Sequence, residues 1–396
     1  MASTEKTSSA TPESAAVLAS GVTAIATETP EYSREIGPNW FASVMGTGII
    51  ANAAAGLPIW GEHLTGFAVV VWLIAAGMLI LLLVIKTLQT LFKPHIIRRQ
   101  LNDAVMAQFF GAPPMAMLTV AGGAVLVGHH VLPEAVALDI GWILWIAGTL
   151  TGLLTAVVIP YLHFTRYETA DDAAFGGWLM PVVPPMVSAS IGALLIPHAQ
   201  SIELQQALLY TCYAMFGLSL MTSLIIITLI WRRLSHAGTS GGARVPTLWI
   251  VLGPLGQSVT AIGSLGVVAM AILPANVGMG FHTMALLYGI PVWGFAFYWS
   301  MIAGLLTLRA MRRHMPFALT WWAFTFPVGT CVTGTTQLAH YTGLTLVSWM
   351  AVALFLGLLL AWLIAAVGTS RGLRQGQILK VPTKAPAVRA RKGHQR

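Results

Sequence analysis

Ten apolar segments alternate with short polar segments along most of this chain. They occupy residues 39–55, 64–92, 104–128, 140–164, 176–196, 204–231, 247–273, 281–308, 317–341 and 344–367. A helix needs about 20 apolar residues to cross a bilayer, and only the first segment is shorter than that. Because unpaired strand edges cannot face lipid, the pattern predicts an all-α integral membrane protein with ten transmembrane helices.

The two ends of the chain lack this pattern. Residues 1–36 are rich in Ala, Ser, Thr and Glu, with no basic start followed by an apolar run, so they do not form a signal peptide. We expect a disordered cytoplasmic tail there and a second, basic cytoplasmic tail over residues 371–396. The ten-helix domain is then expected over residues 37–370.

Composition supports the membrane assignment. Hydrophobic residues make up 56% of the chain and charged residues 9%, whereas soluble domains carry about 25% charged residues. The net charge of +8 does not indicate a nucleic-acid partner, because the basic residues lie in short loops between the apolar segments. Both cysteines, Cys212 and Cys331, fall inside apolar segments, which excludes a disulfide framework.

The loops differ in charge on the two sides of the predicted bundle. Basic residues follow the even segments, and the loops that follow the odd segments contain acidic residues but no Lys or Arg. The basic set is Lys86, Lys93, Arg98, Arg99, Arg166, Arg232, Arg233, Arg244, Arg309, Arg312 and Arg313. Cytoplasmic loops are enriched in Lys and Arg, so both termini are predicted to be cytoplasmic.

Bulky aromatic residues recur near the start of the odd segments. Trp40, Phe109, Trp178, Trp249 and Trp321 are separated by 69, 69, 71 and 72 residues. A fixed period is typical of repeat proteins, and each unit here holds two segments. The chain is therefore predicted to contain five parallel helical hairpins, related by an axis along the membrane normal.

Odd and even segments also differ in composition. The odd segments contain Gly, Pro and small hydroxyl residues, as in residues 44–48 and 180–190, whereas the even segments are mostly Leu, Ile, Val and Ala. Small residues permit close helix packing or can line a water-filled path, and large aliphatic residues are suited to contact with lipid. We expect the five odd segments to surround a central pore. A solid bundle that uses small residues only for packing is the alternative.

The predicted pore is suited to anions. No charged residue lies in the middle of an odd segment, which argues against a tightly ion-coupled pump. Helix N-termini and basic loops at the cytoplasmic mouth would attract anions. The candidate lining donors are Ser43, Thr47, Ser188, Gln257, Thr260, Thr330 and Thr333. Their hydroxyls can instead bond to their own helix.

Prolines and one aromatic residue mark the middle of the predicted pore. Proline removes a backbone hydrogen bond, so Pro181, Pro184, Pro254 and Pro327 are expected to kink the odd helices. Phe326 lies about nine residues, or about 14 Å, into its segment, close to the bilayer midplane. It is either a plug in the pore or a packing residue.

A metal- or haem-binding redox subunit is the second interpretation. Its ligands would be histidines near the outer side, namely His63, His129, His130, His198, His282 and His340. No HExxH spacing occurs, and neither a phosphate loop nor a nucleophile elbow is evident, so we expect no enzyme, metal or cofactor. A structural or receptor-like membrane protein without a path is a third interpretation.

Three motifs resemble the tellurite-resistance/dicarboxylate transporter family, which includes plant slow anion channels, a malate carrier and a sulfite efflux pump. FASVMGTGI at residues 41–49 is similar to the first span of that family, and WWAFTFPVGT at residues 321–330 is similar to its ninth. LGPLGQ at residues 252–257 resembles the seventh span of the malate and sulfite branch.

The resemblance implies ten helices around a pore, assembled as a homotrimer. It implies that Phe326 occludes the pore and that the substrates are anions such as malate, succinate, sulfite, chloride or nitrate. Export of C4-dicarboxylates or sulfite across the plasma membrane is the expected activity. The sequence leaves the choice between these anions open, as it does the choice between a channel and a proton-coupled carrier.

Overall fold

The structure is a computed structural model that describes residues 32–239, 242–376 and 380–382. The chain divides into a helical unit, residues 36–378, and a second unit formed by the two ends, residues 1–35 and 379–396. Within the second unit, β1 (Tyr32–Arg34) pairs antiparallel with β2 (Lys380–Pro382). This pairing of the two predicted tails was not expected. Most of both tails lies outside the described residues.

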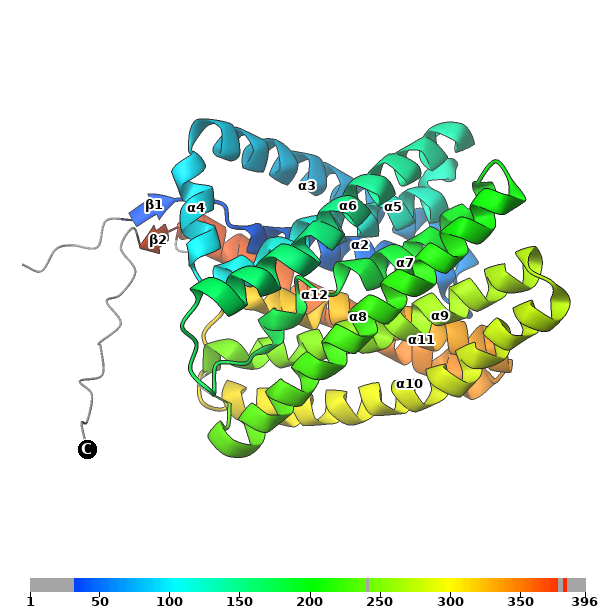
Figure 1. Cartoon of the computed structure of the whole chain (residues 1–396). Helices are drawn as coiled ribbons and strands as arrows, with labels where there is room; N and C mark the ends of the chain where they lie inside the picture. Colours follow the sequence, from blue (N-terminus) through cyan, green and yellow to red (C-terminus); the bar gives the residue numbers. More distant parts are fainter. Residues whose placement is uncertain (1–31, 240–241, 377–379, 383–396) are drawn as a thin grey trace, which may run out of the picture. The chain divides into compact units, whose positions relative to one another are not determined.

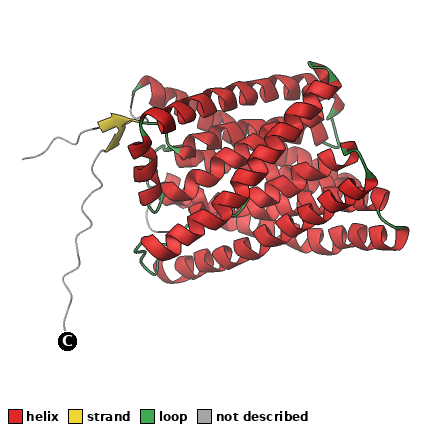
Figure 2. Ribbon diagram, turned by 45° about the horizontal axis from the view of Figure 1, so that its top comes forward, coloured by secondary structure: helices red, strands yellow, loops and turns green. Residues whose placement is uncertain are grey.

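The helical unit contains five long helices alternating with five shorter ones (Figure 1). The shorter helices are α2 (Phe41–Gly56), α5 (Ala112–Val127), α7 (Pro184–Leu195), α9 (Leu252–Ile272) and α11 (Phe326–Thr342). The longer helices are α3 (Thr65–Phe92), α6 (Glu134–Arg166), α8 (Ile202–Ala237), α10 (Ala275–Met311) and α12 (Thr345–Arg374). Figure 2 shows that helices account for nearly all of the described chain. α12 continues three residues past Arg371, where the C-terminal tail was expected to begin.

Each shorter helix is preceded by a 3-10 helix that carries one of the periodic aromatic residues. These are η1 (Pro38–Trp40), η3 (Met106–Gly111), η5 (Gly176–Leu179), η7 (Gly242–Val251) and η8 (Leu319–Phe324). In every odd segment a 3-10 stretch therefore precedes the α-helix, which begins one to six residues after the aromatic residue. The remaining short elements are η2 (Glu62–Leu64), α4 (Pro94–Asn102), η4 (Gly128–His130) and η6 (Ile196–His198).

The prolines explain where the change occurs. Pro184 begins α7, and Pro327 and Pro254 lie in the first turns of α11 and α9. Proline lacks an N–H and is therefore tolerated in the first turn, where that group has no partner inside the helix. The prediction of kinks inside continuous helices is corrected here: these prolines begin α-helices, and Pro181 lies in the turn before α7.

The shorter helices form a closed ring. α2 contacts α5, α5 contacts α7, α7 contacts α9, α9 contacts α11, and α11 returns to α2. Each long helix packs on the shorter helix before it and on the one after it. The buried share is 78% for Met106–His130 and 72% for Arg244–Ile272, but 22% for Glu134–Arg166 and for Ala275–Met311. This burial matches the predicted division into inner and outer segments.

Glycines close the seams between neighbouring inner helices. A Cβ at Gly256 of α9 would lie 2.6 Å from the backbone of Cys331 in α11. A Cβ at Gly46 of α2 would overlap Thr325, and one at Gly329 would overlap Ile49. Only glycine permits the neighbouring helices to approach this closely, so no side chain fits between them at these positions.

Tryptophans on the long helices form hydrogen bonds to neighbouring shorter helices. Trp72 of α3 donates its indole N–H to the Val120 carbonyl of α5 at 3.0 Å, and Trp145 of α6 donates to the Ser188 carbonyl of α7 at 2.9 Å. Trp293 of α10 donates to Thr335 of α11, and Trp362 of α12 donates to Thr47 of α2. Each bond joins a long helix to the shorter helix that follows it or, for α12, to α2.

Seven segments of the described chain are long and apolar enough to cross a membrane. Each contains one long or inner helix, and these helices are α3, α5, α6, α8, α9, α10 and α12. The multi-pass membrane assignment follows from them. The helices α2, α7 and α11, with 16, 12 and 17 residues, are not among these seven segments.

Candidate functional site

A cavity of about 190 Å³ lies inside the ring of inner segments. All five odd segments contribute to its wall, four through the 3-10 part or the first turns of the α-helix and the third through the turn between η5 and α7. The lining residues are Asn39, Ala42, Met45, Val105, Met106, Phe109, Met115, Met180, Val183, Thr247, Ile250, Gly253, Pro254, Leu319, Thr320, Trp322, Ala323, Phe326 and Pro327. The cavity is therefore central with respect to the ring and lies towards the N-terminal ends of the inner helices.

Phe326 is one of the residues that line this cavity. It is the first residue of α11, is 4% exposed, and lines the wall together with Gly253 and Pro254 of α9. The residue before it, Thr325, is fully buried and donates its hydroxyl to the Trp322 carbonyl at 2.7 Å. This bond and the following proline fix the start of the helix, and the position of the Phe326 ring follows from that start.

Helix N-termini converge at the same depth. Met45, Met115, Gly253 and Phe326, which line the cavity, lie within the first turns of α2, α5, α9 and α11. The free N–H groups of an α-helix give its N-terminus a partial positive charge. The sequence placed the helix N-termini at the cytoplasmic mouth, and in the structure the α-helical turns begin beside the cavity, after the 3-10 segments.

Three of the predicted lining residues gather on the seam between α9 and α11. The hydroxyls of Thr260 and Thr333 are 2.8 Å apart and share a hydrogen bond. Thr330 is fully buried and donates to the Leu252 carbonyl at 3.2 Å and to the Pro327 carbonyl at 2.7 Å. These hydroxyls hold the two helices together next to Phe326.

Gln257 lies one turn beyond Gly253 on α9. Its side chain is 3% exposed, and its Oε1 has no hydrogen-bond partner. On α2, Asn52 donates to the Thr119 carbonyl at 3.1 Å, while its Oδ1 has no partner. A buried amide oxygen without a donor is costly, and it can accept a hydrogen bond from water but not bind an anion, so both oxygens are candidates for contact with a water molecule.

The other predicted lining hydroxyls bond within their helix or to an outer helix. Thr47 donates to the Ser43 carbonyl at 2.8 Å and accepts the indole N–H of Trp362 at 3.0 Å. The Ser188 hydroxyl is 2.5 Å from that of Thr149 in α6. Ser43 donates back to the Trp40 carbonyl at 2.7 Å. Thr47 and Ser188 therefore bond to the outer helices α12 and α6. Other residues form the lining of the anion path that is proposed below.

The outer histidines do not form a cluster of potential metal ligands. Within the described ranges, no three His, Cys, Asp or Glu side chains lie together as a metal site requires. The rings of His129 and His130 lie 4.0 Å apart, and His282 stacks on Tyr341 at 4.4 Å. These contacts are aromatic packing at the outer ends of the bundle.

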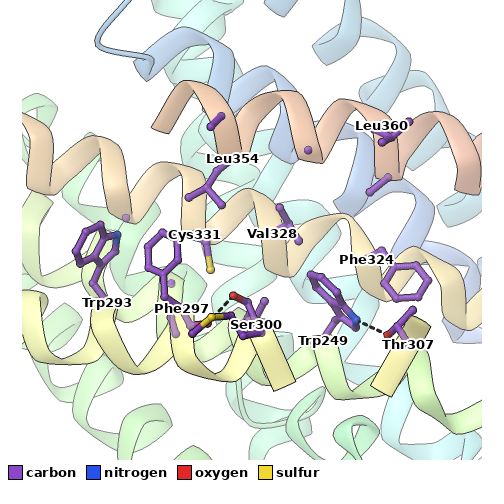
Figure 3. Close-up of a pocket in the computed structure, with 18 of the residues that line it drawn as sticks. Trp249, Trp293, Phe297, Ser300, Thr307, Phe324, Val328, Cys331, Leu354 and Leu360 are labelled. Atoms are coloured by element: carbon purple, nitrogen blue, oxygen red, sulfur yellow. Dashed lines mark hydrogen bonds between the residues drawn. The ribbon is translucent and has the colours of Figure 1, made fainter. Parts of the chain in front are cut away.

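A second, larger cavity of about 460 Å³ lies outside the ring, between α10 and α12 (Figure 3). Trp249, Phe297, Phe324, Val328 and Leu354 are among its lining residues, and none of the residues that line it is charged. Val328 is two residues from Phe326 and so lies on the opposite face of α11. An apolar groove on the outer surface is a poor path for an anion, so the central cavity is the better candidate.

Comparison with known proteins identifies the family. The sequence profile of the voltage-dependent anion channel family matches residues 35–370. The chain belongs to this family. A sulfite efflux pump of Trichophyton rubrum is 27% identical over 307 residues, covering 76% of this chain and 81% of the relative. An uncharacterized transporter of Methanocaldococcus jannaschii is 23% identical over 350 residues, covering 88% and 98% respectively.

These relatives confirm the predicted family and support its malate and sulfite branch. A member of this family is a membrane anion channel or transporter. The signal that the sequence reading missed is the 3-10 segment before each inner helix, although the Pro and Gly residues at each junction indicate its place.

Proposed function

We propose that this protein moves small anions across the plasma membrane through the ring of inner helices, with Phe326 as the gate. The observation that carries the proposal is the central cavity, which all five odd segments line and to whose wall Phe326 belongs. A phenyl ring in a narrow passage blocks an ion, and the helix N-termini beside it favour an anion over a cation.

The path requires ten membrane crossings in five hairpins. α2, α7 and α11 are short, but each is extended by its 3-10 helix to about the 20 residues that a crossing needs. A 3-10 helix rises about 2.0 Å per residue, more than the 1.5 Å of an α-helix, so the combined segments cover the bilayer with fewer residues. The excess of Lys and Arg in the loops after the even segments supports cytoplasmic termini.

The lining suggests how the anion is held. The proposed path is formed by the apolar wall of the cavity, Gly253, Phe326 and, beyond them, Gln257 and the hydroxyls of Thr260, Thr330 and Thr333. No fixed charge lies in α2, α5, α7, α9 or α11, so the anion would be attracted without being held tightly. Weak attraction of this kind suits conduction, because the ion must also leave.

Sulfite is the first candidate substrate, and malate and succinate are the second. The relatives named as sulfite efflux pumps favour sulfite. The cavity of about 190 Å³ also suits a small ion, since pockets for drug-sized ligands have about 300–1,000 Å³. Export is the proposed direction. The family resemblance further suggests a homotrimer, which the mass of the solubilised protein would test.

Flux assays in proteoliposomes test the proposal. Purified protein is reconstituted, and efflux of sulfite, malate, succinate and chloride is compared with that of protein-free vesicles. We expect anion efflux, with sulfite among the permeant ions, and a reversal potential set by the anion gradient. A potential that follows potassium or sodium, or no flux of any anion, would refute the proposed activity and favour a receptor-like or redox protein.

A further inference from the structure

A third cavity, separate from the ring, lies between the C-terminal ends of α8 and α10. Its volume is about 720 Å³. The lining residues are Trp231, Leu234, Ser235, Gly238, Thr239, Val245, Ile302, Leu306, Arg309, Ala310, Arg313, His314, Met315 and Pro316. Two arginines and one histidine belong to this wall, and none of the residues that line it is acidic. The anion path does not account for this cavity.

The wall of this cavity is apolar at one end and basic at the other. Ile302, Leu306 and Arg309 lie four and three residues apart, so they form one stripe on α10, and Arg313 follows in the turn after Met311, where the helix ends. The stripe is apolar in its first half and basic at the helix end. On α8, Trp231, Leu234 and Ser235 face the same cavity. An occupant that matches this wall has an apolar part deep between the helices and an anionic part at their ends.

The surroundings are those of a membrane interface. Trp231 is 45% exposed and stacks on Tyr298 of α10 with ring centroids 6.4 Å apart. Exposed Trp and Tyr gather at the level of lipid headgroups. Arg309 and Arg313 are exposed at the loops that the positive-inside rule places in the cytoplasm. The cavity therefore opens at the headgroup level of the inner leaflet.

His314 lies in the turn that follows α10 and lines the cavity. His314 has φ +56°, a left-handed conformation that glycine usually supplies at helix ends. The Met315 N–H closes the turn on the Ala310 carbonyl at 3.2 Å. Gly343, after α11, adopts the same conformation without a side chain. At α10 the strained position carries an imidazole that lines the basic cavity.

We propose that this cavity binds the headgroup of an anionic phospholipid from the cytoplasmic leaflet. Arg309 and Arg313 would contact the phosphate, His314 would hydrogen-bond to the headgroup, and one acyl chain would lie along Leu306 and Ile302. Guanidinium groups form strong, charge-assisted bonds with phosphate. Basic pockets between helices on the cytoplasmic side are suited to such lipids. The proposal relies on the membrane orientation given above but not on transport.

The simplest alternative is that the arginines only offset the negative C-terminal end of α10. A matched pair of variants separates the two. Arg309→Gln/Arg313→Gln removes the charges that line the cavity. Arg232→Gln/Arg312→Gln removes two exposed charges at the ends of the same helices, and neither of those residues lines it.

The test is binding in detergent, monitored by the rise in melting temperature as lipid is titrated. The probes are short-chain phosphatidylglycerol, short-chain phosphatidylcholine and inorganic phosphate. We expect saturable binding of phosphatidylglycerol to the wild type and to the Arg232/Arg312 variant. We expect affinity to fall by about tenfold or more in the Arg309/Arg313 variant.

Equal loss of affinity in both double variants would overturn the proposal, because general surface charge would then explain the binding. An equal response to phosphatidylcholine would overturn it too, as would a response to phosphate alone that matches the lipid. Anion flux is measured on the same preparations. A protein that binds the lipid but conducts no anion would refute the transport proposal and leave this one standing.

Discussion

Gly253 of α9 and Phe326 of α11 line the same cavity from neighbouring inner helices. A Cβ built at Gly253 meets no atom within 4 Å, so the glycine leaves open space in front of the aromatic ring. Three residues further along α9, a Cβ at Gly256 would overlap the backbone of α11. Gly253 therefore leaves space in the cavity, and Gly256 permits the close contact between α9 and α11 beside it.

This difference gives the first prediction. Gly253→Leu should fold, because the side chain enters free space, but it should lower anion flux several-fold by filling the cavity. Gly256→Ala should instead destabilise the protein, because a Cβ there lies 2.6 Å from the backbone of α11. Melting temperature and flux per protein measure both effects. Unchanged flux in a well-folded Gly253→Leu protein would place the path elsewhere.

The gate gives the second prediction. Phe326→Ala removes the proposed gate from the cavity wall, so anion flux should rise several-fold with little loss of stability. Phe324→Ala is the matched control. Its ring packs against Trp249 and Trp321 at centroid distances of 5.6 and 5.7 Å and lines the outer groove.

Phe324→Ala should lower stability without opening the path. A Phe→Ala change in a buried core typically costs about 3–5 kcal/mol, and Phe324 is half-buried, so the expected loss is smaller than that. If Phe326→Ala is the variant that melts early and conducts no faster, Phe326 is a packing residue. Thermal melting and proteoliposome flux on both variants decide this.

The third prediction concerns Thr47, whose hydroxyl accepts the Trp362 indole N–H at 3.0 Å. Thr47→Val leaves that N–H without a partner. The free energy of unfolding should fall by about 1–3 kcal/mol, with anion selectivity unchanged. Thr228→Val on α8 is the control, since its exposed hydroxyl bonds only to its own helix, and it should have little effect. Altered selectivity in Thr47→Val would return Thr47 to the path.

The fourth prediction is the orientation. Tags at Gly61, Leu132 and Ile202 should react with a membrane-impermeant reagent outside the cell, and tags at His95, Gly238 and Met315 should react only after permeabilisation. The reason is the absence of Lys and Arg from the loops of the first group. Labelling of Gly238 in intact cells would reverse the orientation and would also move the basic cavity between α8 and α10 to the outer leaflet.

Several features of the fold could be predicted because they depend on local composition. The greasy even segments and the Gly- and Pro-rich odd segments differ enough to separate outer from inner helices, and the buried shares agree with that division. The recurring aromatic residues mark homologous places, since Trp40, Phe109, Trp178, Trp249 and Trp321 all lie in the 3-10 helices. Motifs near residues 41, 252 and 321 were enough to indicate the family.

Other features depend on partners that lie far away in the sequence. The bond from Trp362 to Thr47 joins residues 315 positions apart, and nothing near either residue indicates the other. The position of Pro327 predicted a kink, but its true effect depends on where the preceding 3-10 helix ends, which the packing of η8 against α2 and η7 helps to determine.

By itself the sequence determined the class of protein, the division into inner and outer segments, the family and the residues available to line a path. Only the tertiary structure decided which side of each inner helix faces the axis. The physical reason is that these helices are apolar and buried all round, so no amphipathic pattern fixes their rotation. Thr47 and Ser188 turn towards outer helices and Phe326 towards the cavity because of contacts with neighbouring helices, and those contacts exist only once the ring has closed.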